Sequence, residues 1–295
     1  MSKQINISDW IEKSKANPDK YLFRQIVEIL INAIAYTKFL KGNMFLKGGT
    51  LMALAHESQR MTGDVDFSWL EPFHKDAMLN IDKIIKESLN NSLKRVKNDL
   101  GYLNLVCKVQ SIEKKPDWKQ KNLSFPALKI RIGYAKVNTR QAQLLDQNKS
   151  SQVLTVDISF NEDIISSHEL ILSDTQETIN AYTPIEIISE KFRALIQQIY
   201  RGRNRRQDVY DIDFLLKQFK FDDLEKKAIL QNMLRKSESR SIYPNPKSLS
   251  DIRIKEKAQQ EWNTLNLELN QKNKLPDFEE CYQNIRCFYE SLPWQ

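Results

Sequence analysis

The hydrophobic pattern of this chain changes its period near residue 180, and this change constrains the fold more than any other feature. Before that point, three stretches alternate apolar and polar residues with the period of half-buried strands: residues 103–109, 128–134 and 153–160. Beyond it, apolar residues recur only at helical spacing. We therefore predict an α+β domain over residues 1–180 and an α-helical domain over residues 181–295.

Helix signals lie on both sides of the strand-rich region. Residues 8–40 and 75–97 have helical periodicity. After residue 180, the stretch Thr183-Pro184-Ile185-Glu186 is typical of a capping box with proline at the first helical position. We predict further helices over residues 207–219, 222–236, 248–267 and 277–292.

Composition narrows the class of protein. The 295 residues are 41% apolar, which is enough to fill a core. The richest apolar run, residues 26–40, is interrupted by Glu28, Asn32 and Lys38, and the three cysteines lack the spacing of a disulfide framework or a zinc site. We expect a cytoplasmic protein without a membrane segment.

The sharpest local feature is the acidic strand pattern Asp64-Val65-Asp66-Phe67. Residues two apart on a strand point to one face with Cα atoms roughly 6 to 7 Å apart, so Asp64 and Asp66 can reach one cation. Their mutual repulsion favours either a raised pKa on one of them or a bound cation, and Mg²⁺ is the usual ion, with Mn²⁺ as the alternative. An exposed strand face is the competing explanation.

A glycine turn precedes this strand. Gly48 and Gly49 fall between a short apolar strand pattern and a helical one, where backbone N–H groups can approach an anion at the helix N-terminus. Thr50 adds a hydroxyl, and the spacing is not that of a Walker A loop. A tight turn alone would also explain the two glycines.

A third carboxylate is needed in many phosphoryl-transfer sites to hold a second metal ion and to activate the attacking hydroxyl. Asp157 is the candidate, because it lies in the strand pattern 153–160 on the face opposite the apolar residues. A solvent-facing acid on a one-sided sheet is the alternative.

Charged residues of the helical part add further candidates. Lys191 lies beside the apolar stripe of its helix, where it either extends to water or binds a triphosphate. Asp208 and Asp211 are three residues apart and share a helix face, although acids also favour helix N-termini in general. Four arginines between residues 201 and 206 form a basic cluster in a chain of net charge +7.

Taken in order, these residues resemble the AbiEii/AbiGii toxin family of nucleotidyltransferases over about residues 40–220. The matching set is Lys47-Gly48-Gly49-Thr50, Arg60, Asp64 with Asp66, Asp157, and Glu190-Lys191 followed by Arg206-Gln207-Asp208 and Asp211. The resemblance implies a DNA polymerase β-like nucleotidyltransferase fold, with a mixed sheet flanked by helices, and a bacterial toxin of type IV toxin-antitoxin or phage-abortive systems.

The resemblance also implies roles for the residues. Asp64, Asp66 and Asp157 would bind Mg²⁺ and act in catalysis. Lys191 and either Asp208 or Asp211 would also be functional, and the choice between these two acids stays open. The nucleoside triphosphate would be bound by a set drawn from both parts of the chain: Lys47, Gly48, Gly49, Thr50, Arg60 and Lys191.

The expected activity is therefore transfer of a nucleoside monophosphate to an RNA acceptor, with the 3′ end of a tRNA as the leading candidate. The helical domain would contribute to the active-site cleft, and a cognate antitoxin is an expected partner. Nucleotidylation of a protein is the alternative reaction, and a non-catalytic RNA-binding toxin is the alternative class. Residues beyond about 220 match no known motif.

Overall fold

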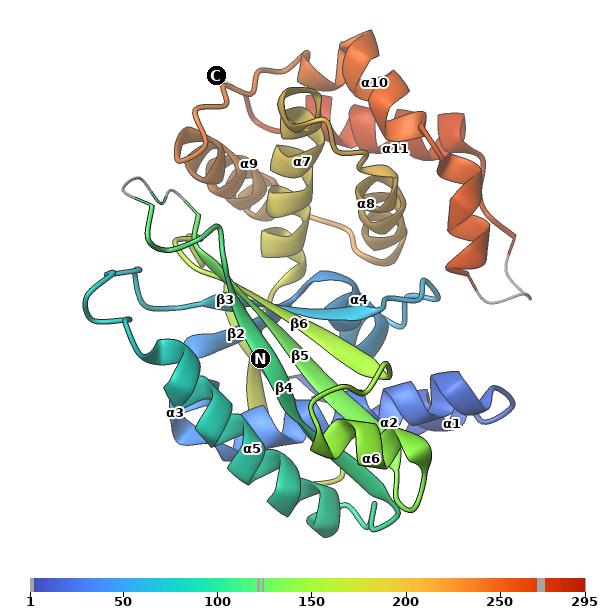
Figure 1. Ribbon diagram of the computed structural model, residues 1–295. Helices are drawn as coiled ribbons and strands as arrows, with labels where there is room; N and C mark the ends of the chain where they lie inside the picture. The colour runs from blue at the N-terminus through green and yellow to red at the C-terminus, as the bar shows by residue number, and fades with distance from the viewer. Residues whose placement is uncertain (1–2, 121–122, 124, 270–273, 295) are drawn as a thin grey trace. The chain divides into compact units, whose positions relative to one another are not determined.

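The chain divides into two units in the structure, which is a computed structural model describing residues 3–120, 123, 125–269 and 274–294 (Figure 1). The first unit comprises Met1–Ala55, Thr62–Asp163 and Ser167–Ala181. The second comprises His56–Met61, Ile164–Ser166 and Tyr182–Gln295. The boundary is therefore not at one position in the sequence, because two short segments that precede residue 180 group with the helical unit.

The first unit is built on a mixed sheet of eight strands among the residues described, in the order β1-β7-β8-β2-β3-β6-β5-β4. The pairs β1/β7, β2/β8 and β3/β6 are parallel, and β2/β3, β5/β6 and β4/β5 are antiparallel. The strands are β1 (Lys3–Ile5), β2 (Met44–Lys47), β3 (Asp64–Trp69), β4 (Leu105–Lys115), β5 (Ala127–Lys136), β6 (Val153–Ser159), β7 (Ser167–Leu172) and β8 (Thr178–Tyr182).

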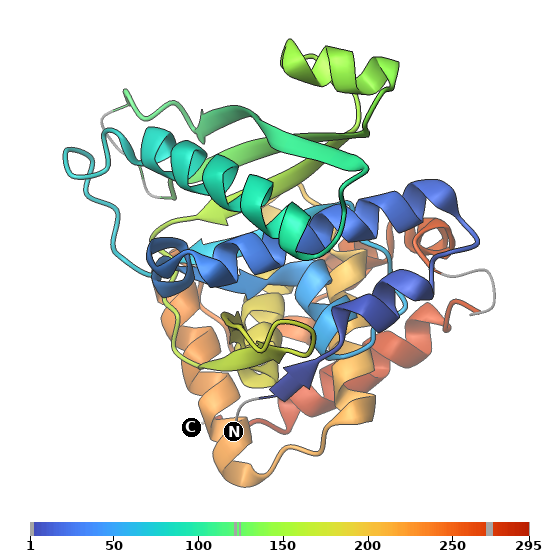
Figure 2. The same cartoon turned by 90° about the horizontal axis from the view of Figure 1, so that it is seen from below.

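Two long helices, α2 (Pro18–Tyr36) and α5 (Ile81–Asp99), lie side by side against the sheet (Figures 1 and 2). Asn17 caps α2 by accepting a hydrogen bond from Lys20 N, and α5 buries every third or fourth residue. The remaining helices of this unit are α1 (Ile7–Glu12), α3 (Lys38–Asn43), α4 (Gly48–Ala55) and α6 (Arg140–Asp146).

The alternation of the central strands determines which face of the sheet is apolar. Val65 and Phe67 of β3, like Val156 and Ile158 of β6, are 0% exposed. Asp66, between Val65 and Phe67, and Asp157, between Val156 and Ile158, are only half-buried. Because side chains alternate between faces, the acidic residues of β3 and β6 share the face opposite this apolar layer.

The second unit is helical. Its first helix, α7 (Pro184–Arg201), is capped by Thr183 and ends at Gly202, whose φ of 63° is the left-handed conformation that glycine adopts readily. The further helices are α8 (Arg206–Gln218), α9 (Asp223–Glu238), α10 (Ile252–Gln259) and α11 (Phe278–Glu290), with short 3₁₀ turns η1 (Ser248–Ser250) and η2 (Trp262–Leu267).

The capping box predicted at the start of α7 forms only in part. Thr183 Oγ1 accepts from Glu186 N at 3.2 Å. The Glu186 carboxylate, 0% exposed, instead accepts from Ile165 N and Ser166 N at 3.3 and 3.1 Å and pairs with Lys236 Nζ at 2.7 Å. These bonds explain why segment 164–166 groups with the helical unit.

The continuous helix predicted over residues 248–267 is wrong. The structure breaks this stretch into η1, α10 and η2. Asp251 begins a new helix by accepting from Arg253 N, and Glu261 has a φ of 60°, which no α-helix accommodates. Most apolar residues of the stretch are still buried, namely Leu249, Ile254, Ala258, Trp262 and Leu265, which is why its periodicity resembled that of one helix.

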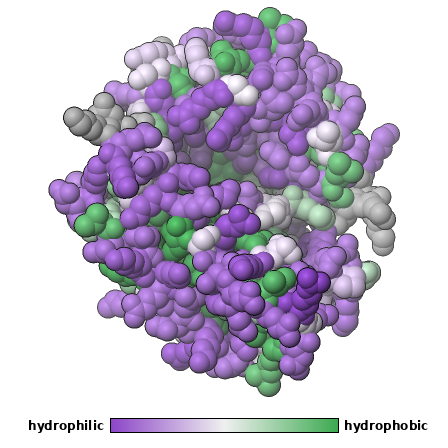
Figure 3. All heavy atoms as spheres, in the orientation of Figure 1, coloured by the Kyte–Doolittle hydropathy of each residue, from purple (hydrophilic) through white to green (hydrophobic). Residues whose placement is uncertain are grey.

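Hydrophilic side chains dominate the face of the molecule drawn in Figure 3. Among the residues described, no helix combines the length and apolar character that crossing a bilayer requires.

Candidate active site

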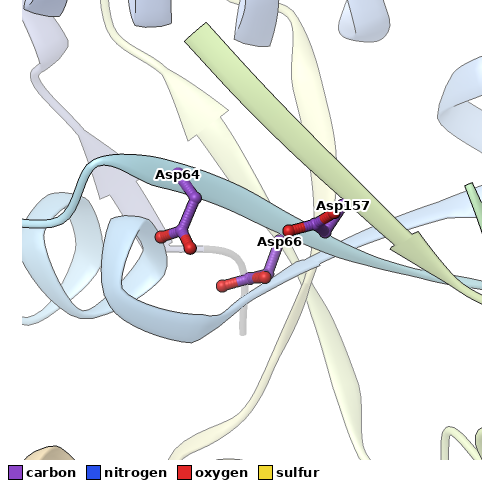
Figure 4. A group of neighbouring side chains, drawn as sticks. All are labelled: Asp64, Asp66 and Asp157. Carbon is purple, nitrogen blue, oxygen red and sulfur yellow. The ribbon is translucent and has the colours of Figure 1, made fainter. Parts of the chain in front are cut away.

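Three aspartates converge on the polar face of the sheet. Asp64 and Asp66 project to one side of β3, and Asp157 of the adjacent strand β6 points toward Asp66 (Figure 4). Asp66 and Asp157 are partners in the parallel register of the two strands. One carboxylate oxygen from each residue lies within 4.8 Å of those of the other two. The sheet therefore gathers the three acids that the sequence suggested.

This donor set suits a divalent cation. All three ligands are half-buried carboxylates, and hard cations such as Mg²⁺ prefer oxygen donors. The pKa of Asp157 is raised, first because burial disfavours the charged form and also because Asp64 lies nearby, while Lys129 and Lys47 oppose the shift. A bound cation would relieve the repulsion that this crowding produces.

A threonine outside the candidate set orients the first acid. Thr62 Oγ1 donates to Asp64 Oδ1 at 2.6 Å. This bond restricts the rotamer of the carboxylate and leaves its second oxygen for other ligands. In the sequence the only hint was a hydroxyl two residues before the acid, a spacing that alone predicts little.

Gly48 is required by its contact with the acidic strand. Its φ is 70°, and a Cβ built at this position would collide with the carboxylate of Asp66 and lie 3.0 Å from that residue's Cβ. The expected glycine turn between β2 and α4 is therefore present, and it packs directly against a candidate metal ligand.

Thr50 connects the turn to the same strand. Its side chain is 0% exposed, and Oγ1 donates to the backbone oxygen of Asp64 at 2.8 Å. The hydroxyl thus already has a protein partner. Its expected contact with a triphosphate stays a prediction.

Lys47 lies opposite Asp66 in the register of β2 and β3. Its ammonium group pairs with Glu162, whose carboxylate also accepts from Ser68 Oγ at 2.8 Å. This ion pair was not foreseen, because Glu162 follows β6 and is 115 residues away in the chain. A phosphate bound by Lys47 would compete with Glu162 for the ammonium group.

The other charged candidates meet within the helical unit. Lys191 Nζ lies 2.7 Å from Asp208 Oδ1 and 2.8 Å from Asp211 Oδ2. Arg60 forms a two-pronged pair with Asp211, through Nε at 3.1 Å and Nη2 at 2.9 Å. These four residues form one network of alternating charges, which we call the Lys191 network.

The ion pairs of the Lys191 network keep Asp211 and Lys191 charged although both side chains are largely removed from solvent. Burial by itself would raise the pKa of Asp211, but the charges of Arg60 and Lys191 outweigh it and hold the pKa at about 2. Burial likewise opposes the charge of Lys191, whose pKa is nevertheless raised by Asp208 and Asp211. Asp211 and Lys191 are therefore both ionised near neutral pH.

Glu268 supports the network from outside and was missed in the sequence. It pairs with Arg60 at 3.2 Å and with Arg206 at 3.3 Å. Its backbone oxygen accepts from Met61 N at 2.6 Å, which anchors the segment that carries Arg60. No motif surrounds Glu268, so the sequence offered no means of finding it.

The candidate residues thus form two sets. The acids Asp64, Asp66 and Asp157 lie with Lys47, Gly48, Gly49 and Thr50 in the first unit. The Lys191 network lies in the second. The catalytic and binding roles of all of them stay predictions.

Comparison with known proteins identifies the family. Residues 30–284 match the profile described as nucleotidyl transferase AbiEii toxin, type IV toxin-antitoxin system. The chain belongs to this family. The resemblance drawn from the motifs is thereby confirmed, and the AbiEii assignment extends beyond the motifs into the C-terminal helices. Membership makes the chain a nucleotidyltransferase toxin, with a nucleoside triphosphate as substrate, and implies an antitoxin partner.

One solved structure, that of MenT4, agrees with the expected fold of an AbiEii protein. MenT4, a nucleotidyltransferase toxin from Mycobacterium tuberculosis H37Rv, aligns with a TM-score of 0.57 at 12% identity, over 97% of this chain and 90% of that one. JHP933 from Helicobacter pylori aligns with a TM-score of 0.44 at 17% identity, over 92% and 90%. No curated protein matches the sequence. The predicted α+β class, with a mixed sheet flanked by helices, is confirmed.

Proposed function

We propose that this toxin is a Mg²⁺-dependent enzyme that transfers a nucleoside monophosphate from a nucleoside triphosphate to an RNA, with the 3′ end of a tRNA as the leading acceptor. Modification of that RNA would arrest growth or abort phage infection. The substrates place the reaction in the cytoplasm, where the antitoxin would oppose it.

The observation that carries this proposal is the convergence of Asp64, Asp66 and Asp157 within 4.8 Å beside Gly48. Phosphoryl-transfer sites need a cation that neutralises charge on the phosphates, and carboxylates are its usual ligands. Mg²⁺ held here would polarise the phosphate oxygens and lower the pKa of the acceptor hydroxyl.

The reaction itself is a substitution at phosphorus. The acceptor hydroxyl oxygen forms a bond to the α-phosphorus of the nucleoside triphosphate, and the bond from that phosphorus to the bridging oxygen of the β-phosphate breaks. Pyrophosphate leaves, and the hydroxyl proton passes to a base or to solvent. The residues of the protein position the two substrates for this step.

We assign the turn at Gly48, Gly49 and Thr50 to the triphosphate, because it begins α4, where backbone N–H groups lack helical partners. Lys47, Arg60 and Lys191 would neutralise phosphate charge. Asp208 and Asp211 would hold Lys191 ionised and in place, as they do in the structure.

An RNA acceptor is favoured by the arginines at the end of α7. Arg201 and Arg203 are exposed, and the pKa of Arg201 is lowered by burial and then by Arg193, Arg203 and Arg205. Such mutual repulsion between cations favours a polyanion at this surface. Arg205 and Arg206 of the same stretch contact acids at 3.7 Å and 3.3 to 3.4 Å.

The test is a labelling assay with purified protein, Mg²⁺, total RNA and each of the four α-labelled ribonucleotides separately. We expect one discrete RNA to be labelled, and we expect Asp66→Ala and the isosteric Asp66→Asn to abolish the labelling. Asp146→Asn, which removes an exposed acid of α6, is the matched control.

Other outcomes would replace parts of the proposal. Label on protein would overturn the RNA acceptor and establish protein nucleotidylation instead. Growth arrest that persists with Asp64→Ala would mean that the toxin acts by binding RNA and not by catalysis.

A further inference from the structure

Two basic residues of β5 lie next to the acidic triad on the sheet, and nothing so far assigns them a role. Lys129 is the register partner of Asp157 across β5 and β6. Arg131 is the partner of Thr155, which is in turn the partner of Asp64. One cross-sheet row therefore runs over five strands through Lys47, Asp66, Asp157, Lys129 and Glu113.

The two side chains share the face of the triad. The intervening residues of β5, Leu128, Ile130 and Ile132, are 0% exposed and point to the apolar layer. Lys129 is half-buried and Arg131 is exposed. Neighbouring strands are about 4.8 Å apart, so Lys129 lies one strand spacing from Asp157 and about 10 Å from Asp66.

These cations differ from the other basic candidates in their partners. Among the residues described, neither side chain forms a hydrogen bond or a salt bridge. The nearest acid beyond them in the row, Glu113, pairs with Lys115 at 2.9 Å. Lys47, by contrast, pairs with Glu162, and Lys191 with two aspartates. Lys129 and Arg131 act on Asp157 and Glu113 through their charge alone, so their hydrogen-bond donors are available to an external anion.

The strand order indicates which anion this is. The glycine turn belongs to β2 and α4, on one side of the triad, and β5 lies on the other. A triphosphate bound at the turn leaves the β5 side to the second substrate. Asp157, the ligand nearest β5, is also the acid assigned to the attacking hydroxyl.

We propose that Lys129 and Arg131 bind the backbone phosphates of the RNA acceptor next to its reacting hydroxyl. The inference rests on the proposed function, since it specifies the acceptor side of the same site. Two cations two residues apart on one strand face, roughly 6 to 7 Å between Cα atoms, suit a chain of phosphates. The guanidinium of Arg131 can also bind a phosphate through two hydrogen bonds. A protein hydroxyl would offer no such anion.

Steady-state kinetics with total tRNA as acceptor test this assignment. For Lys129→Gln with Arg131→Gln we expect the KM for tRNA to rise by about tenfold or more, with the KM for the nucleoside triphosphate within about twofold. The salt dependence of tRNA binding should also weaken, by a slope of about one per lost phosphate contact. Lys129→Arg should retain most of the affinity, and Arg131→Lys should retain the charge but lose the two-hydrogen-bond contact.

The control is Lys136→Gln, an exposed residue at the end of the same strand and outside both rows. Filter binding of tRNA without nucleotide separates the two proposals. The wild type could transfer nothing to tRNA while the double variant binds tRNA less tightly than the control. In that case the proposed transfer to tRNA is wrong, and the inferred phosphate contact of Lys129 and Arg131 is supported.

Two results would overturn the inference. One is a double variant whose tRNA binding and KM for tRNA equal those of Lys136→Gln. This result would leave RNA transfer by the wild type unaffected. The other is a rise in the KM for the nucleoside triphosphate instead of that for tRNA, which would assign the pair to the triphosphate.

Discussion

Gly48 lacks a side chain for two independent reasons. Its φ of 70° is unfavourable for any residue with a Cβ, and the space that a Cβ would need is occupied by the carboxylate of Asp66. The sequence predicted a turn at this position from the glycine pair alone. It could not predict the second reason, because Asp66 is brought there only by the pairing of β2 with β3.

Replacing this glycine should therefore affect activity more than stability. For Gly48→Ala we expect a loss of about 1 to 2 kcal/mol in the free energy of unfolding from the backbone conformation. We expect kcat to fall about 100-fold, because Asp66 must move away from the metal site. Urea unfolding and the nucleotide-transfer assay measure the two effects.

Gly42→Ala is the matched control, since this glycine lies within α3, has no atom near its missing Cβ and does not have a positive φ. It should keep full activity and lose no stability. A Gly48→Ala enzyme as active as this control would show that the contact with Asp66 does not matter.

At the scale of elements, the Lys191 network connects α7, α8 and the segment that carries Arg60. Asp211 is its centre, because its 0% exposed carboxylate receives both Arg60 and Lys191. The family resemblance of the sequence indicated that these residues are functional. It could not indicate that they pair with one another, because Arg60 and Asp211 are 151 positions apart.

This network should make stability depend on pH in the acid range. The pKa of Asp211 is lowered from 3.8 to about 2, so the folded state binds its proton less readily than the unfolded chain. The contribution is complete above about pH 4 and is lost as the pH falls toward 2. We expect the wild type to lose roughly 2 kcal/mol from this group over that window.

Urea unfolding between pH 5 and pH 2.5 measures this loss against Asp211→Asn. The variant should be less stable at neutral pH, by roughly 3 to 5 kcal/mol, because Arg60 and Lys191 each lose one of their two acidic partners. Its stability should then decline less steeply with acid. An equally steep decline in both proteins would mean that Asp211 does not contribute as described.

The elements themselves were predicted where the pattern is local. Alternation identified β3, β5 and β6, and it identified the first part of β4. It missed β1, β7 and β8, which are short and owe their strand conformation to partners far away in the chain, such as β1 on β7. The helix over 248–267 was wrong because the left-handed residue Glu261 has no marker in the sequence.

At the scale of the whole molecule, the sequence could predict which acids form the site but not how they meet. Asp64 and Asp66 share a face by strand geometry alone. Asp157 joins them only because β6 lies parallel to β3 in a register that aligns it with Asp66. Strand order and register depend on contacts between distant residues, and local periodicity does not contain them.

The same sheet explains why the predicted site has two sides. From β2 to β5 the polar face presents Lys47, then Asp66 and Asp157, then Lys129. A nucleotide and an acceptor, both anionic, would each meet a cation on their own side of one metal site. On the proposed function, a single face of the sheet would orient both substrates.

Transfer rates measured against Mg²⁺ concentration test most directly whether the three aspartates bind the catalytic ion. The wild type and Asp146→Asn should show the same saturable dependence on Mg²⁺. Asp157→Asn should lose about 1,000-fold in rate, since a misplaced ion forfeits several kcal/mol of charge stabilisation. An Asp157→Asn protein with the wild-type rate and the wild-type Mg²⁺ dependence would contradict a metal site at Asp64, Asp66 and Asp157.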